Sequence, residues 1–183
     1  GPSVKPYQPE GYWENLNFPT RTWVADTGEG QYRRGLYTWW QRSFLHPSVL
    51  AFDAPSREEC AADRSRSNIP QQALVLLNDP TYVEAQRALG VRMIREGGGS
   101  PRERVAYGFR LVLARTPAAQ ELTILTRTLV RMLADYRSDP KAAEALLKVG
   151  ESPVPDGIDK AEVAAYAFVA GTLLNLDETI TRE

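Results

Sequence analysis

The prolines that follow helix-capping residues constrain the fold of this chain more than any other feature of its sequence. A residue whose side chain can cap a helix stands just before a proline at Asp79-Pro80, Ser100-Pro101, Thr116-Pro117 and Asp139-Pro140, and more loosely at Asn68-Ile69-Pro70. Proline suits the first position of a helix because no backbone N–H is needed there and its fixed φ already matches the helix. The repetition of this pattern predicts a fold that is mainly α.

Apolar residues at helical spacing follow each of these prolines. Their spacing predicts helices over residues 70–78, 80–95, 101–114, 117–136 and 140–149. Asp159 and Glu162 form a further capping pattern, which predicts a last helix to about residue 176. Because this last segment is apolar nearly all round, we expect it to run through the middle of the helices.

The first 45 residues have a different pattern. Residues 1–30 are rich in Pro, Gly and aromatic side chains, which predicts an extended N-terminal arm that its aromatic residues fix to the core. Residues 31–45 carry apolar side chains at steps of three and four, which predicts a helix. Gly35 and the β-favouring residues 37–39 leave a strand as the alternative. We expect His46-Pro47 to end this element.

Residues 52–80 hold the only cysteine of the chain, together with several arginines and carboxylates. The run Phe-Asp-Ala-Pro at the start predicts a tight turn, because Asp favours turn starts and Pro fixes φ. Ser56 and Glu59 form a capping-box pattern, so we expect a short helix through Cys60.

Long motifs in this stretch resemble a known family. The segments FDAP-x-R-x-x-C and R-x-R-x-N-x-P-x-Q-A-L-x-L-L-N-D-P are similar to the C-terminal domain of unknown function (domain-of-unknown-function family 1553, PSD type) of planctomycete-type surface proteins that contain a cytochrome c module. GPSVKPYQPEGYWE, YRRGLYTWWQR, FRLVLARTPAAQEL and LLNLDETITRE agree with the same family. The resemblance therefore covers nearly the whole chain.

The resemblance implies a setting, and no established activity comes with it. Such proteins are exported, so an extracytoplasmic location, periplasmic or at the cell surface, is expected from the resemblance alone. The 183 residues suit one domain, and we expect 1–183 to be the C-terminal part of a larger chain, with 1–30 as the arm and 31–183 as the helical body. Since the chain has no C-x-x-C-H motif, any c-type haem is expected elsewhere in the full-length protein.

Charge and hydropathy exclude several classes of partner. The chain has 22 basic and 23 acidic side chains, for a net charge of −1, whereas nucleic acids and anionic membranes attract a basic excess. No apolar run of about 20 residues occurs, so no membrane span is expected in this chain. One cysteine and one histidine are too few for an internal disulfide or an ordinary zinc site, so no metal is expected.

Arg57, Arg64 and Arg66 lie close in sequence to Asp53. One interpretation is an anion or sugar-acid site, because the arginine fork matches carboxylates and sulfates. The other is a buried network of ion pairs that fixes the turn at Asp53, and we favour it because structural networks imitate functional sites.

Asp177 and Glu178 could supply further partners for these arginines, or a carboxylate pair for acid–base chemistry. Neighbouring residues on a helix point about 100° apart, so the structural role is favoured. Cys60 is either a small buried residue or a reactive thiol whose thiolate the nearby arginines would stabilise.

Our leading interpretation is a non-catalytic structural or interaction domain of an exported, cytochrome-linked multidomain protein, with the preceding domain of the same chain as its partner. The alternative is a contribution to a polysaccharide-binding or polysaccharide-degrading site shared with that domain. The Trp39-Trp40 pair, Trp13 and Trp23 could stack on sugar rings, although tryptophans at such spacing are more often part of the core. Whether the chain is an enzyme stays open.

Ligand count generates a first prediction. We expect no transition metal and no haem to co-purify with residues 1–183, because one His and one Cys cannot complete a coordination sphere without several carboxylates. Elemental analysis and an absorption spectrum of the purified chain check this. A transition metal at one equivalent per chain would contradict it.

Overall fold

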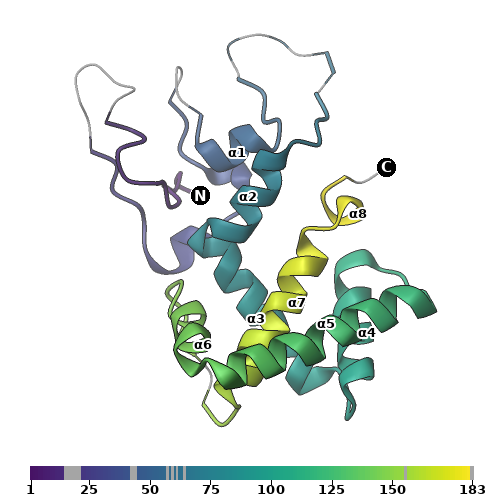
Figure 1. The fold of residues 1–183 in the computed structure, drawn as a ribbon. Coiled ribbons are helices and arrows are strands. Elements are labelled where there is room, and N and C mark those ends of the chain that lie inside the picture. Colours follow the sequence, from purple (N-terminus) through teal and green to yellow (C-terminus); the bar gives the residue numbers. More distant parts are fainter. Residues whose placement is uncertain are drawn as a thin grey trace. The chain divides into compact units, whose positions relative to one another are not determined.

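Helices make up the regular structure of this chain, so the mainly α prediction is confirmed (Figure 1). The computed structural model describes residues 1–14, 22–41, 45–56, 58, 60, 62–63, 65–154 and 156–181. The chain divides into a first unit, Gly1–Val75, and a second unit, Leu76–Glu183. Helix α2, Pro70–Asn78, includes the point of division.

The second unit is built from helices that follow one another after short connections. They are α3 (Pro80–Glu96), α4 (Pro101–Leu113), α5 (Ala119–Ser138), α6 (Pro140–Leu147), α7 (Lys160–Leu174) and α8 (Asp177–Ile180). Helix α7, yellow in Figure 1, packs against α3, α4, α5 and α6. The prediction that the last long helix runs through the middle is therefore confirmed.

Helix α7 is buried on almost every side because its sequence is apolar almost all round. Its buried residues include Val163, Tyr166, Val169 and Leu173. Two hydrophobic clusters meet on it, one with Met93 and Phe109 among its members and one with Ala143 and Leu147.

Glycine allows α3 and α7 to approach to backbone contact. A Cβ built on Gly90 of α3 would lie 2.7 Å from the backbone nitrogen of Ala167 and 2.8 Å from the carbonyl carbon of Tyr166. Real Cβ atoms do not approach backbone so closely, so no other residue fits at Gly90 unless the two helices move apart.

Most of the predicted helix starts are confirmed in the second unit. Asp79 accepts a hydrogen bond from the Thr81 amide at 2.9 Å, and Ser100 forms a reciprocal capping box with Glu103. Asp139 caps α6 in the same way, at 3.1 Å from the Ala142 amide.

The predicted start of α5 at Thr116-Pro117 is two residues too early. The helix begins at Ala119, and the amide of Ala118 donates to the Glu121 carboxylate at 2.6 Å. Glu121 thus satisfies a free amide at this end, which moves the start of the helix beyond the proline.

The helix predicted over residues 31–45 is wrong within its described part, residues 31–41 and 45. The chain forms two 3-10 turns, Gly28–Tyr32 and Gly35–Tyr37, and then an isolated bridge between Thr38 and Val4. The reason is tertiary: the Val4 amide donates to the Tyr37 carbonyl at 2.8 Å, and the Trp39 amide donates to the Val4 carbonyl at 2.6 Å. The backbone groups of Tyr37 and Trp39 that a helix would need are therefore hydrogen-bonded to Val4 of the extended arm.

Two expectations near residue 50 also need correction. His46-Pro47 starts a helix, α1 (Pro47–Ala51), because the ring of His46 caps it through the Ser48 amide. The short helix after Ser56 is absent from the described residues Ser56, Glu58 and Cys60. There Ser56 Oγ accepts from the Glu58 amide at 3.4 Å, a bond across two residues that closes a turn instead. The turn at Asp53, whose φ is +56°, is confirmed.

The contact at Gly90 generates a second prediction. Gly90→Ala should lower the free energy of unfolding by about 1–3 kcal/mol, because the added methyl group meets backbone atoms that cannot rotate away. Thermal unfolding followed by circular dichroism measures the loss. Gly99→Ala is the matched control, since no atom lies within 4 Å of the position that its Cβ would take. Equal melting temperatures for the two variants would contradict the contact.

Candidate functional site

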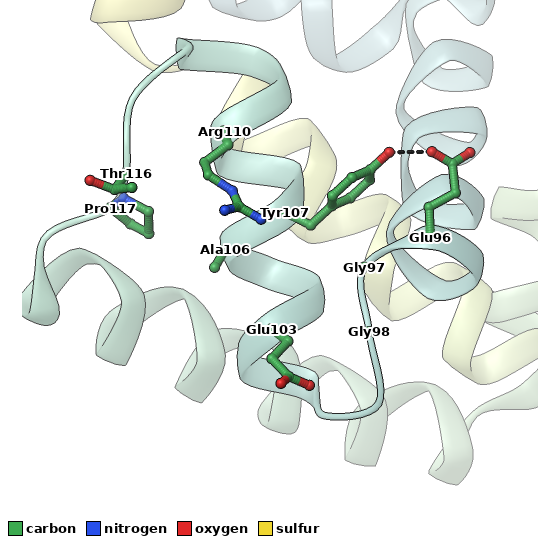
Figure 2. Close-up of a pocket in the computed structure, with 9 residues that line it drawn as sticks. All are labelled: Glu96, Gly97, Gly98, Glu103, Ala106, Tyr107, Arg110, Thr116 and Pro117. Carbon is green, nitrogen blue, oxygen red and sulfur yellow. Dashed lines mark hydrogen bonds between the residues drawn. The ribbon is translucent and has the colours of Figure 1, made fainter.

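A hollow of about 430 Å³ lies in the second unit, beside one face of α4 (Figure 2). Its walls come from the end of α3, the α3–α4 turn, α4 and the α4–α5 link. The lining residues are Glu96, Gly97, Gly98, Glu103, Ala106, Tyr107, Arg110, Thr116 and Pro117. The i, i+3, i+4, i+7 spacing of the α4 residues places them on one side of that helix.

Tyr107 and Glu96 face each other across this hollow and are joined by a hydrogen bond from the Tyr107 hydroxyl to the Glu96 carboxylate (Figure 2). Arg92 donates to both oxygens of the same carboxylate, at 3.1 and 3.0 Å. Arg92 and Tyr107 hold the pKa of Glu96 below its ordinary value, and the bond to Glu96 raises the pKa of Tyr107. Glu96 is therefore ionised and Tyr107 neutral at pH 7, and neither is prepared to exchange a proton.

Glu103 and Arg110 are the other charged residues of the hollow. Glu103 accepts from the Ser100 amide and hydroxyl, both at 2.9 Å, and these bonds lower the pKa of its carboxyl. The Arg110 side chain is exposed and makes no hydrogen bond or ion pair within the part of the chain that the structure describes. Because two ionised carboxylates share the hollow with one guanidinium, its local charge does not favour an anionic ligand.

A second hollow, of about 620 Å³, lies in the first unit. It is lined by Gln8, Pro9, Glu10, Gly11, Trp13, Glu14, Thr22 and Trp23. Gln8 is 7% exposed, and its side-chain oxygen has no hydrogen-bond partner among the described residues. Glu10 and Glu14 are exposed beside it. A buried amide oxygen, two carboxylates and indole rings are groups that can accept hydroxyl hydrogen bonds and stack on a ring.

Three indole rings cluster in the first unit, and two of them, those of Trp13 and Trp23, line this hollow. The centroids of the Trp13, Trp23 and Trp39 rings lie 5.3 to 5.8 Å apart, in tilted and edge-to-face pairs. The ammonium group of Lys5 lies 5.8 Å from the Trp23 centroid and 5.3 Å from that of Trp39. The aromatic residues thus pack against one another within the first unit.

The structure places Asp53 at the predicted turn and gives it a partner that the sequence analysis missed. Its carboxylate accepts from the Ser67 amide at 2.7 Å and from the Ser67 hydroxyl at 2.8 and 2.9 Å. Arg57 and Arg64 lie outside the described residues. Arg66 is exposed, and among the described residues it has no hydrogen-bond or ion-pair partner. The anion-site and network interpretations of these arginines both stay predictions.

Asp177 and Glu178 begin the short helix α8, and Glu178 has an arginine partner outside the predicted set. Arg115 donates to both Glu178 oxygens at 2.7 Å and to the Glu121 carboxylate at 3.0 and 2.8 Å. Its guanidinium also lies 4.7 Å from the Phe109 ring centroid. One arginine therefore joins α4, α5 and α8.

A buried polar network in the second unit was also missed. Arg87, 4% exposed on α3, donates to the carbonyls of Leu147, Val149 and Ser152, the last two at 2.9 and 2.6 Å. Glu84, one helical turn earlier and equally buried, accepts from the Glu151 amide at 2.6 Å and from the Ser152 hydroxyl. Together these side chains hold the α6–α7 loop against α3. In the sequence, the one sign of this network is that Glu84 and Arg87 are charged residues on an otherwise apolar face of α3.

Within the part of the chain that the structure describes, Cys60 and the possible metal ligands do not come together in a site. Cys60 is exposed and unpaired as a thiol. Among the described residues, no group of three or more His, Cys, Asp and Glu side chains lies close enough to hold a metal ion. In the same part of the chain, no helix combines the length and apolar character needed to cross a membrane.

The Arg115 cluster generates a third prediction, for acid solution. Hydrogen bonds from Arg115 and from the Ala118 amide lower the pKa of the Glu121 carboxyl from an ordinary 4.5 to about 2. The hydrogen bond from Arg115 also lowers the pKa of Glu178. Since the unfolded chain takes up these protons first, the stabilisation is complete above about pH 4.5 and is lost as the pH falls toward 2. We expect the melting temperature of Arg115→Gln to fall less than that of the parent between pH 5.5 and 3.

Arg110→Gln, on the helix that precedes Arg115, is the matched control, because it removes the same charge without a side-chain partner being lost. Its melting temperature should follow that of the parent at each pH. If Arg115→Gln also follows the parent throughout, the cluster does not contribute to acid stability.

Comparison with known proteins identifies the same family as the long motifs of the sequence. Residues 1–129 match the family PSD1, described as "Protein of unknown function (DUF1553)". No curated protein and no solved structure matches the chain. Since the match covers well over half of its 183 residues, this chain belongs to the PSD1 (DUF1553) family.

Proposed function

We propose that this chain is a non-catalytic structural or interaction domain of an exported, cytochrome-linked multidomain protein. The observation that carries the proposal is the Glu84–Arg87 network. These two buried charged side chains bind backbone groups of their own α6–α7 loop, through three carbonyls and one amide. Buried charges that saturate their own backbone in this way stabilise a shape and do not face a substrate.

The ion pairs of the second unit support the same proposal. Arg104 pairs with Glu162 at 2.8 Å and joins α4 to α7, and Arg115 joins α5 to α8 through Glu121 and Glu178. Catalytic carboxylates usually have a raised pKa, because burial or a neighbouring carboxylate disfavours their charge. In this unit the pKa values of Glu96, Glu103, Glu121 and Glu178 are all lowered.

The setting of the proposed domain comes from its family resemblance. We propose that it lies outside the cytoplasm and that its partner is the preceding domain of the full-length chain. A c-type haem would then be held by another module, where a C-x-x-C-H motif can provide the attachment. The exposed aliphatic side chains of Val24 and Leu36, 70% and 71% exposed, are surface that such a partner can cover.

A second candidate function is supported by the hollow in the first unit. Gln8 offers an amide oxygen without a partner among the described residues, and the hollow also contains Trp23 and two exposed carboxylates. Sugar sites combine an aromatic ring with acceptors for hydroxyl groups. We therefore keep a polysaccharide-binding contribution, shared with the preceding domain, as the alternative.

The structural proposal generates a fourth prediction. Arg87→Met should lower the free energy of unfolding by about 2 kcal/mol or more. The buried carbonyl of Leu147 and the half-buried carbonyls of Val149 and Ser152 would lose their donor, and a buried acceptor left without a partner costs about 1–3 kcal/mol. Urea denaturation of the chain measures the loss. Arg95→Met, an exposed arginine on the same helix, is the control and should unfold like the parent. Equal midpoints for all three proteins would remove the main support for a structural role.

The choice between the two functions needs a binding experiment. Residues 1–183 are titrated with a panel of neutral and acidic polysaccharides, and the full-length protein is examined for the absorption spectrum of a c-type haem. The structural proposal expects haem in the full-length protein and no saturable glycan binding by this chain. Saturable binding that Glu10→Ala weakens, without a change in melting temperature, would support the second candidate in its place.

A further inference from the structure

The loop between α6 and α7 contains the one Asp-Gly pair of the sequence, Asp156-Gly157. The pair lies in a turn, and both of its residues are exposed. In the part of the chain that the structure describes, the Asp156 carboxylate has no hydrogen-bond or ion-pair partner, and the Gly157 amide donates no hydrogen bond. An unpaired carboxyl group therefore stands beside an unpaired amide at the surface of the second unit.

Glycine at the second position removes the side chain that would hinder a reaction between these two groups. The φ of Gly157 is +80°, which glycine adopts readily, and no atom lies within 4 Å of the place that a Cβ would take. A bond from its nitrogen to Cγ of Asp156 would close a ring of five atoms. The open surroundings leave room for this closure.

We propose that Asp156-Gly157 is a site of spontaneous backbone modification, which the fold leaves unprotected. The Gly157 nitrogen bonds to Cγ of Asp156, and the amide hydrogen leaves with the carboxyl hydroxyl as water, which gives a succinimide. Water then opens this ring at either carbonyl. Cleavage of the N–Cγ bond restores aspartate. Cleavage between nitrogen and the main-chain carbonyl carbon gives isoaspartate, whose backbone runs through Cβ and Cγ. One water leaves and one returns, so no other reactant is needed.

Aspartates inside the helices of this unit are protected from the same reaction. Asp135 is also exposed, but the amide that follows it belongs to α5 and takes part in the hydrogen bonds of that helix. Ring closure there has to wait until the helix opens locally. At Asp156-Gly157 no such opening is required.

Isoaspartate at position 156 would lengthen the backbone just before the start of α7. The added carbon precedes Ile158, which packs against the second hydrophobic cluster, and Asp159, which caps α7 through the Ala161 amide at 3.2 Å. Glu84 and Arg87 hold the other end of this loop, so the extra length is not easily absorbed there. The isoaspartate form, once separated by chromatography, should melt about 2–4 °C below the unmodified chain, the shift expected for the loss of one cap.

Ageing of residues 1–183 at pH 6 and 37 °C tests the site. An isoaspartyl methyltransferase detects the modified residue, and fragmentation of the tryptic peptide of residues 149–160 locates it by mass spectrometry. Position 156 should contain at least about tenfold more isoaspartate than Asp135, whose helix must first open. The rate in the folded chain should lie within about threefold of the rate in urea, because no local opening precedes the reaction.

Asp156→Glu is the matched control. It keeps the exposed charge, but closure would form a ring of six atoms, which is much slower, so no isomer should accumulate at this position. Gly157 is left unchanged because its positive φ would strain another residue.

Isoaspartate at position 156 in the parent and none in Asp156→Glu supports the proposal. Its absence from the aged parent overturns the proposal, and so does formation in urea alone, which would mean that the fold protects the pair. Equal amounts at Asp156 and Asp135 also contradict it. Equal melting temperatures of the two separated forms would contradict the effect on the cap of α7.

Discussion

The backbone contact between α3 and α7 at Gly90 is the constraint on which the second unit depends. Because no Cβ stands between them there, the two helices lie closer than ordinary side chains permit, and the absence of a Cβ at Gly171 of α7 leaves room for the Gln86 side chain of α3. This closeness leaves α7 with hardly any exposed surface, which explains why its sequence is apolar all round. A second side of α3 faces the α6–α7 loop, where Glu84 and Arg87 bind the backbone of that loop.

Local sequence predicted those parts of the fold whose stabilising bonds are local. The side chains of Ser100 and Glu103 each accept a hydrogen bond from the backbone amide of the other, within one helical turn. Four consecutive residues are therefore enough to predict the start of α4. The same reasoning failed at residues 31–41, where the backbone of Tyr37 and Trp39 pairs with Val4, more than thirty positions away. At His46-Pro47 the capping pattern was present, but histidine is seldom a capping residue, so the start of α1 was read as an end.

The candidate site was less predictable for the same reason. Arg115 and Glu178 are 63 positions apart, and Arg87 reaches carbonyls 60 to 65 positions away. Neither pairing has a signal in spacing, because the partners meet only after α7 has returned the chain to α3 and α4. Proximity in sequence instead suggested Arg57, Arg64 and Arg66 for Asp53, whose described partner is the uncharged Ser67.

The two units rely on different physical interactions, and this bears on how each can respond to its surroundings. In the second unit, apolar side chains and close helix contacts dominate, and these are nearly independent of pH until carboxylates such as Glu121 take up protons far below neutrality. In the first unit, three indole rings and a few long-range bonds to the backbone hold the arm, and one of those bonds joins His46 Nε2 to the Tyr7 carbonyl. A unit held by few contacts loses a large share of its stabilisation with each one. The removal of one side chain from these contacts should therefore weaken the first unit more than the removal of one apolar side chain weakens the second.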